Sequence, residues 1–147
     1  MQMQRRFAAP LLAILCLAEV ASAQGIPPGV QIIPDLQYGR FGASSTLDLY
    51  LPRKARTRTP VIIWIHGGGW EAGNGSKEPW PGISMVDRGF AVASINYRVS
   101  DEAIYPAQIY DCKAAVRWLR SNAKRYNIVS NGLGGYHFFG EVGTTPK

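Results

Sequence analysis

The stretch "TPVIIWIHGGGWEAG", Thr59 to Gly73, sets an apolar run against the most flexible residues a chain can encode. The residues from Val61 to Ile65 are all β-branched or aromatic, which predicts a central strand buried on both faces. His66 and three consecutive glycines follow at once. Because ordering glycine costs conformational entropy, the triplet indicates a place where the backbone itself must be approached closely.

A turn of Gly67, Gly68 and Gly69 after a strand can present successive backbone N–H groups with no Cβ atoms in the way. Acyl transfer needs such donors for the oxyanion of its tetrahedral intermediate, and each lost donor costs about two to three orders of magnitude in rate. The other interpretation is a glycine-rich loop that only turns the chain. The motif alone leaves both open, because short motifs often match by chance.

Further strands are predicted on both sides of this run. Residues 45–52 alternate three leucines with Asp48 and Tyr50, which is the period of a half-buried strand. Phe90 to Arg98 begins apolar and predicts the next strand, and a short edge strand broken by a proline is expected within residues 31–39.

Two helices are predicted between and after these strands. Ile83 to Arg88 is expected to form a short helix closed by Gly89. After Pro106, which suits a first helical turn, apolar residues recur at spacings of three and four and form one face of an amphipathic helix. That face consists of Ile109, Cys112, Val116, Leu119 and Ala123. The order of elements predicts an α/β fold with a mostly parallel sheet, in which Cys112 is a small buried hydrophobe.

The predicted order stops after Ile128. Another buried strand is expected there, but residues 129–147 contain five glycines and have no clean hydrophobic period. We therefore predict a divergent tail in place of a strand. Its "GLGG" segment follows no predicted strand and opens no apolar helix, which argues against a nucleotide-binding loop.

The N-terminus has the pattern of a secretory signal peptide: two arginines, an apolar stretch over residues 7–20 and an Ala-Ser-Ala site ending at Ala23. A membrane anchor is the alternative, but Pro10 and Glu19 interrupt a run that is already short for a bilayer. We expect cleavage after Ala23, a secreted or periplasmic protein, and no membrane association after cleavage. The chain then divides into a signal peptide (1–23), an N-terminal arm (24–44), a partial domain (45–128) and the tail (129–147).

The formal net charge of +6 is concentrated in Arg53 to Arg58 and in Lys124 and Arg125, which read as a solvated loop and a helix end. No aromatic residues interleave these cations and no recognisable module contains them, so no nucleic-acid partner is predicted. Two histidines and one cysteine outside the signal peptide form no ligand cluster, so no metal and no cofactor are predicted.

Several segments, in this order, resemble the N-terminal half of α/β-hydrolases: "LDLYLP", "PVIIWIHGGGW", "GNGSK", "GFAVASINYR" and "YPAQIYDCKAAVRWLRSNAKRYNI". The resemblance covers roughly Leu47 to Ile128 and is closest to the feruloyl- and acetyl-esterase-like branch (BD-FAE type), near the hormone-sensitive-lipase-like carboxylesterases. It implies a mostly parallel α/β-hydrolase sheet and hydrolysis of carboxylic esters through an acyl-serine intermediate. A small-molecule ester or acylated sugar is the implied substrate.

The resemblance also implies roles for the turn. Gly68 and Gly69 would supply oxyanion N–H groups, while His66 and Gly67 would order the loop, with the histidine ring bound to nearby backbone and not acting as the catalytic base. Trp70 would pack at the wall of the site.

Arg98 and Asp111 would form a structural ion pair between a strand and the following helix. The alternative is two solvated charges.

The nucleophile of this family stands in a G-x-S-x-G turn, followed along the chain by an acid and a histidine. "GASST" at Gly42 and "GISMV" at Gly82 lack the second glycine. Ser130 and His137 are a conceivable relocated pair, but they stand seven residues apart with no acid placed beside them. We therefore predict no catalytic residues, a fold truncated before the nucleophile elbow, and a chain with little or no activity of its own.

Two alternatives to a truncated esterase remain open. One is a non-catalytic binding module, and the other is a non-functional fragment of a truncated or frameshifted gene. Codons can be chosen for Asn131 to Gly134 so that a shifted reading frame encodes Arg-Ile-Gly. The resemblance leads us to expect this tripeptide before the nucleophile elbow.

Overall fold

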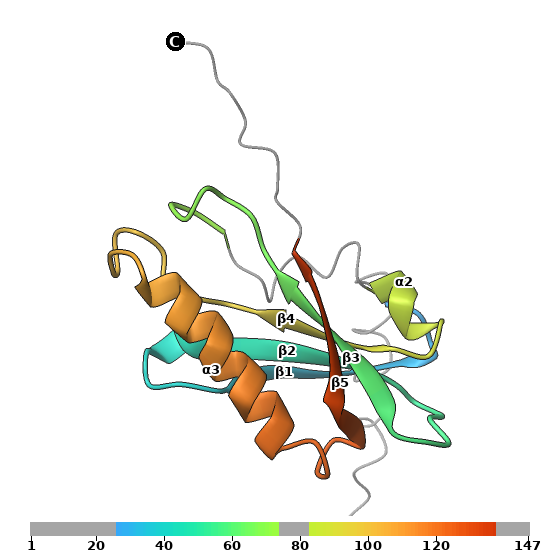
Figure 1. Ribbon diagram of the computed structural model, residues 1–147. Helices are drawn as coiled ribbons and strands as arrows, with labels where there is room; N and C mark the ends of the chain where they lie inside the picture. Colours follow the sequence, from blue (N-terminus) through green and yellow to red (C-terminus); the bar gives the residue numbers. More distant parts are fainter. Residues whose placement is uncertain (1–25, 74–82, 138–147) are drawn as a thin grey trace, which may run out of the picture.

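The computed structural model describes residues 26–73 and 83–137, with side chains up to Asn131 (Figure 1). The predicted signal peptide, most of "GNGSK", Gly82 and the last ten residues of the tail lie outside these ranges. Within them, no helix has the length and apolar character needed to cross a bilayer.

The described residues form a five-stranded sheet in the order β1-β2-β4-β3-β5 (Figure 1). β3 pairs in parallel with β4 and β5, whereas β2 is antiparallel to both β1 and β4, so β2 alone runs against the other four strands. The predicted α/β fold with a mostly parallel sheet is confirmed. The strand bounds are β1 (Val30–Gln37), β2 (Thr46–Pro52), β3 (Thr59–Ile65), β4 (Ala91–Ile95) and β5 (Ile128–His137).

β1 is the predicted edge strand, and it continues past Pro34 because the pairing with β2 shifts register between Ile33 and Leu36. Asp35 sits in this irregularity at φ 54 and donates its N–H to the Asp48 carboxylate at 2.9 Å. Burial raises the pKa of Asp48, and this backbone hydrogen bond opposes the rise. The bulge therefore absorbs a proline that an unbroken ladder would exclude.

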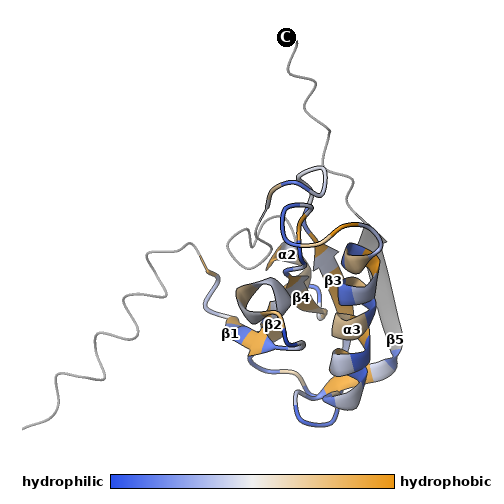
Figure 2. Cartoon of the chain, turned by 90° about the vertical axis from the view of Figure 1, so that its left-hand side faces the viewer, coloured by the Kyte–Doolittle hydropathy of each residue, from blue (hydrophilic) through white to orange (hydrophobic). Residues whose placement is uncertain are grey.

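The central strands bury both faces, as predicted from their unbroken apolar run. Ile63 packs in one cluster with β2, β4 and helix α3 (Ala107–Ser121), whereas Ile62 packs in another with helix α2 (Ile83–Val86). Successive side chains of a strand point to opposite faces, so the two clusters fill the two sides of one sheet. Figure 2 shows hydrophilic and hydrophobic residues along the whole length of α3.

The buried face of α3 differs from the prediction. Its buried residues are Gln108, Asp111, Ala115 and Leu119, whereas Ile109, Cys112 and Val116 are only partly buried. The buried face is shifted by about one residue from the predicted one because two polar side chains lie on it, and both have polar partners there. Gln108 donates to the carbonyl of Ala103 at 2.8 Å, and Asp111 pairs with Arg98. Partial burial still raises the pKa of the Cys112 thiol to about 11.

Three predicted boundaries move. Pro106 directly precedes α3 and is not in its first turn, and α2 ends at Val86, three residues before the Gly89 at φ 87 that terminates it. β4 stops at Ile95, three residues before the predicted end at Arg98.

The prediction that no strand follows Ile128 is wrong. β5 pairs in parallel with β3, with Leu133 opposite Val61 and His137 opposite Ile65. Glycines weaken the side-chain pattern of a strand but keep the N–H and C=O groups that make the ladder. The hydrophobic period used for prediction is therefore missing even though the backbone pairs.

Candidate active site

The glycine turn lies at the carboxyl edge of the three parallel strands. Residues 66–70 follow β3, and Ile65 is opposite Ile95 of β4 on one side and His137 of β5 on the other. Open α/β sheets bind ligands outside the carboxyl ends of their strands. The topology therefore places the predicted oxyanion loop where this kind of sheet holds its site.

Gly68 and Gly73 are needed as glycines because other atoms of the chain lie very close to their Cα atoms. Gly68 has φ 118, and its carbonyl accepts hydrogen bonds from the N–H groups of Glu71 and Ala72 at 3.0 and 3.1 Å. A Cβ on Gly68 would lie 1.9 Å from the Ala72 carbonyl oxygen, and one on Gly73 would lie 2.2 Å from His66 Nδ1. Neither position can carry a side chain without moving the turn.

Gly69 is different from its neighbour. Its φ is 62, but a Cβ there would meet nothing within 4 Å. Gly68 and Gly69 are both exposed, and within the described residues neither of their N–H groups donates a hydrogen bond. Their assignment as oxyanion donors stays a prediction.

His66 lies under the turn, buried to 4% exposure. Its Nδ1 is 2.8 Å from the Gly67 carbonyl oxygen, and its ring stacks on Tyr97 with centroids 4.3 Å apart and an interplanar angle of 9°. The Tyr97 hydroxyl donates to the His66 carbonyl at 2.7 Å. Burial raises the pKa of Tyr97 to about 12, so the hydroxyl keeps its proton at neutral pH. The histidine ring is bound to backbone, and its role in ordering the loop stays a prediction.

Trp70 flanks the turn with 43% of its surface exposed and its ring edge-on to Tyr97 at 5.7 Å. Its φ of 67 is unusual for a bulky residue. Ser100 fixes this conformation, because its N–H and Oγ donate to the Trp70 carbonyl at 2.6 and 2.9 Å. Trp70 and Ser100 line a cavity of about 130 Å³ together with Tyr105, Gln108 and Ile109. Sequence reasoning missed Ser100, since its partner is thirty residues away.

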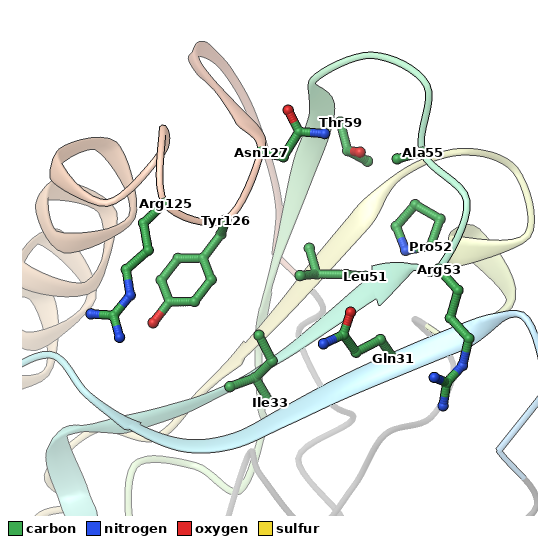
Figure 3. A pocket seen from close by; sticks show the side chains of 10 residues that line it. All are labelled: Gln31, Ile33, Leu51, Pro52, Arg53, Ala55, Thr59, Arg125, Tyr126 and Asn127. Atoms are coloured by element: carbon green, nitrogen blue, oxygen red, sulfur yellow. The ribbon is translucent and has the colours of Figure 1, made fainter.

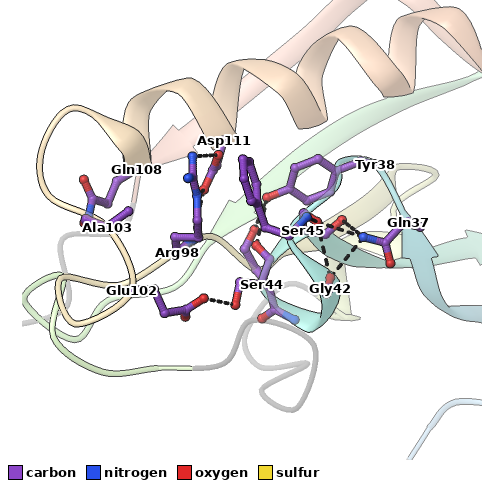
Figure 4. A network of polar contacts seen from close by, with 12 residues as sticks. Gln37, Tyr38, Gly42, Ser44, Ser45, Arg98, Glu102, Ala103, Gln108 and Asp111 are labelled. Carbon is purple, nitrogen blue, oxygen red and sulfur yellow. Dashed lines mark hydrogen bonds and ion pairs between the residues drawn. The ribbon is translucent and has the colours of Figure 1, made fainter.

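Arg98 and Asp111 form the ion pair that the resemblance implied, and the alternative of two solvated charges is wrong. Nε and Nη2 of Arg98 contact the two carboxylate oxygens at 2.8 and 2.9 Å, and the Arg98 N–H donates to the same carboxylate at 3.1 Å (Figure 4). The side chain of Asp111 is 4% exposed. The Arg98 guanidinium also lies 3.5 Å from the centroid of the Phe41 ring. The pair joins the loop after β4 to α3.

Separate polar contacts lie near this pair and tie the 3₁₀-helix η1 (Gly42–Ser45) to its neighbours, as Figure 4 shows. Ser44 Oγ donates to Glu102 at 2.5 Å, and Tyr38 donates its hydroxyl to the carbonyl of Asn96. The Asn96 amide donates to Thr46 Oγ1 at 3.0 Å. The loops at this edge are therefore tied to one another as well as to the sheet. "GASST" forms this short helix, so it is not a nucleophile elbow.

The relocated pair of Ser130 and His137 fails on distance. Leu133 is opposite Val61 and His137 is opposite Ile65, so His137 lies at least four strand residues, about 13 Å, beyond Ser130. Among residues 26–73 and 83–131, no group of three or more potential ligand side chains is placed to hold a metal ion.

Comparison with known proteins agrees with this geometry. The BD-FAE family model matches residues 47–135. Esterase LipQ of Mycobacterium tuberculosis is 34% identical over 112 residues, which are 70% of this chain and 27% of LipQ. Carboxylesterase NlhH of the same species is 38% identical over 76 residues, 51% of this chain and 24% of NlhH.

Solved structures give the same assignment. A truncated form of a carbohydrate esterase from gut microbiota has a TM-score of 0.65 at 40% identity, covering 71% of this chain and 38% of that one. Esterase B from Lactobacillus rhamnosis, bound to an inhibitor, has a TM-score of 0.62 at 27% identity, covering 82% of this chain and 40% of that one. The chain thus spans well under half the length of these relatives. It belongs to the BD-FAE family of α/β-hydrolase esterases.

Proposed function

We propose that this chain carries the oxyanion part of a carboxylic-ester hydrolase that works through an acyl-serine intermediate. The observation that carries the proposal is the turn after β3, where Gly68 and Gly69 are exposed residues at the carboxyl edge of the parallel strands and their N–H groups donate no hydrogen bond within the described residues. The esterase relatives support the same chemistry.

In the proposed reaction, the ester carbonyl oxygen lies against the N–H groups of Gly68 and Gly69. A serine Oγ attacks the carbonyl carbon, the oxygen becomes an oxyanion, and the alcohol leaves with a proton as the acyl-serine forms. Water then cleaves the acyl-serine and releases the acid. Donors held in place before the reaction stabilise the oxyanion without reorganising, and the contacts of His66 and Ser100 hold this turn.

The nucleophile itself is missing from the printed sequence, which contains no G-x-S-x-G and no serine after Ser130. In this fold the nucleophile follows a strand at the turn into a helix. The end of β5 lies beside the end of β3, because His137 is opposite Ile65. We infer that the chain alone is inactive or nearly so, since oxyanion donors without a nucleophile leave only residual acceleration.

The proposed substrate is a small-molecule ester or an acylated sugar. The carbohydrate esterase among the structural relatives supports the sugar, and the cavity beside Trp70, lined by Tyr105 and Ile109, supports an apolar acyl or aryl group. The signal-peptide pattern ending at Ala23 supports action outside the cytoplasm, in the periplasm or the medium.

A second candidate is a chain with no catalysis, either a binding module or a fragment of a truncated or frameshifted gene. The missing serine favours it. The family match through residue 135 argues against a change of frame directly after Ile128. The nucleotide sequence tests this point: a continuation that encodes G-x-S-x-G in another frame would support the fragment, and two closed frames would contradict it.

The donors can be tested without turnover. We expect a short alkylphosphonate, whose anionic oxygens stand in for the oxyanion, to shift the amide resonances of Gly68 and Gly69 in the ¹⁵N-labelled full-length chain. Gly68→Ala should abolish these shifts by displacing the turn, while Gly69→Ala keeps its N–H group and an uncrowded site. Proline at 69 would be a poor probe, because its φ near −65° is incompatible with the φ of 62.

Hydrolysis of p-nitrophenyl acetate completes the test. Background rates with phosphonate-induced shifts at both glycines would support an oxyanion site without a nucleophile. Turnover lost in Gly68→Ala would instead reveal a working esterase with a nucleophile elsewhere. The assignment of these donors would be refuted if the phosphonate caused no shifts and the ester was not turned over.

A further inference from the structure

A second candidate site lies at the opposite edge of the sheet, where the parallel strands begin. Two basic segments that are far apart in the sequence meet there: residues 53–58 before β3 and residues 124–125 before β5. Asn127 joins them, because its carbonyl accepts the N–H of Thr59 at 2.9 Å and its side-chain amide donates to the carbonyl of Thr57 at 3.3 Å. We call this region the basic edge.

The charge of the basic edge is not neutralised within the described residues. The basic edge contains six cationic side chains, as many as the formal net charge of +6 on the whole chain. All six are exposed, and the salt bridge that the described residues contain, Arg98–Asp111, involves none of them. The cations are Arg53, Lys54, Arg56, Arg58, Lys124 and Arg125. Such a cluster attracts anions and repels itself, so a ligand with several negative charges would be favoured there.

A pocket of about 260 Å³ lies between the two segments (Figure 3). Arg125 and Arg53 stand on its two sides, and Leu51 and Gln31 lie between them. No carboxylate is among the described residues that line it. The Arg125 guanidinium lies 5.4 Å from the centroid of the Tyr126 ring, which limits the directions that its side chain can take.

The lining combines three kinds of contact. Guanidinium groups pair with carboxylates through two parallel hydrogen bonds. The side-chain amides of Gln31 and Asn127 can bind hydroxyl groups, while Leu51 and the ring of Tyr126 provide apolar surface. A sugar acid has all three counterparts: a carboxylate, a hydroxyl-bearing edge and an apolar C–H face.

Other polyanions fit less well. The exposed large hydrophobic residues of the described chain are Phe41, Trp70, Ile104, Tyr105 and Tyr110, and none lies on the basic edge, so no wedge for a lipid bilayer is present there. Single-stranded nucleic acid binds by stacking bases on aromatic rings. Tyr126 is only partly exposed and packs against Trp118 at 5.8 Å.

We propose that the basic edge binds an acidic polysaccharide, with one uronic acid unit in the pocket between Arg53 and Arg125 and neighbouring units along residues 54–58. The site is independent of the ester chemistry at the opposite edge. It would hold the protein on a carboxylated glycan while the carboxyl edge stays free.

Binding of tetragalacturonate to the full-length chain, measured by calorimetry, tests the proposal. Arg53→Ala combined with Arg125→Ala should weaken binding about tenfold or more, because each removes a charge-assisted hydrogen bond. Lys113→Ala with Arg117→Ala removes the same charge from the exposed side of α3 and should change the affinity by no more than about twofold. A neutral tetrasaccharide should bind at least about tenfold more weakly than the acidic one.

Gln31→Leu separates sugar recognition from general charge. Gln31 is exposed, and its loss should weaken tetragalacturonate binding several-fold but leave polyphosphate binding unchanged. The proposal is overturned if tetragalacturonate does not bind, or if the Lys113/Arg117 variant loses as much affinity as the Arg53/Arg125 variant. It is also overturned if polyphosphate, single-stranded DNA or anionic vesicles bind as tightly as the sugar acid. None of these outcomes alters the phosphonate shifts at Gly68 and Gly69, so the two proposals can fail separately.

Discussion

The two ends of the parallel strands differ in whether their polar groups are paired. At the carboxyl edge, Arg98 is paired with a buried carboxylate, His66 is bound to backbone, and four residues between 68 and 73 have positive φ. At the basic edge, six cations stand exposed and form no ion pair with any described residue, and Asn127 is the described residue there with positive φ. Strained backbone persists only where surrounding contacts hold it. The backbone at the carboxyl edge is thus held by internal contacts, as the proposed oxyanion site requires, and the basic edge is a surface of exposed charge.

Arg98→Met should give the largest effect on stability. It leaves the Asp111 carboxylate buried without its partner, and we expect a loss of about 3 kcal/mol in the free energy of unfolding, measured with urea. Adding Asp111→Leu should recover much of the loss, because the unpaired charge is removed. A loss below about 1 kcal/mol would mean that the carboxyl edge depends on its ion pair no more than an exposed surface does.

Gly68→Ala compared with Gly69→Ala tests whether the turn is held by its own close contacts. The first places a Cβ 1.9 Å from a backbone oxygen at φ 118, and we expect a loss of about 2 kcal/mol. The second meets nothing within 4 Å and should cost only the left-handed conformation, about 1 kcal/mol. Equal losses in urea unfolding would show that the neighbours of Gly68 yield easily.

Ser100→Ala removes one of the two donors to the Trp70 carbonyl. We expect a loss of about 1 kcal/mol in thermal unfolding, because the backbone N–H of Ser100 remains in place. Faster amide exchange in residues 68–73 should accompany it. Ser121→Ala at the exposed end of α3 is the control and should stay within about 0.5 kcal/mol. An unchanged exchange rate in the Ser100 variant would mean that the Ser100 side chain does not stabilise the turn.

Arg56→Ala with Arg58→Ala should have the smallest effect. Both side chains are exposed and form no ion pair in the part of the chain that the structure describes, so stability should change by no more than about 0.5 kcal/mol. Relief of repulsion should make the variant slightly more stable at about 0.01 M salt, and this gain should disappear near 1 M, where the Debye length is short. A clear destabilisation at both salt concentrations would mean that the basic edge, like the carboxyl edge, is held by internal contacts.

Prediction from sequence succeeded where the residue pattern of a short segment is compatible with a single kind of structure. The run from Val61 to Ile65 is apolar on both faces because helices cover both sides of the sheet. The order of elements around it predicted the α/β fold with a mostly parallel sheet, and the resemblance of its segments to a known family implied the α/β-hydrolase fold. It failed where partners are distant. The buried face of α3 contains Asp111 only because Arg98 comes from the loop after β4, and the glycine-rich β5 is a strand because β3 supplies its ladder.

The sequence by itself determined the central strand, the glycine turn and the family, since these depend on residue types within short segments and on their order. Only the tertiary structure decided which glycine is crowded, that Ser100 holds Trp70, and that residues 53–58 meet residues 124–125 in one pocket. The physical reason is that burial, crowding and charge density depend on which distant segments the sheet brings together, and a strand order of β1-β2-β4-β3-β5 cannot be read from the order of residues along the chain.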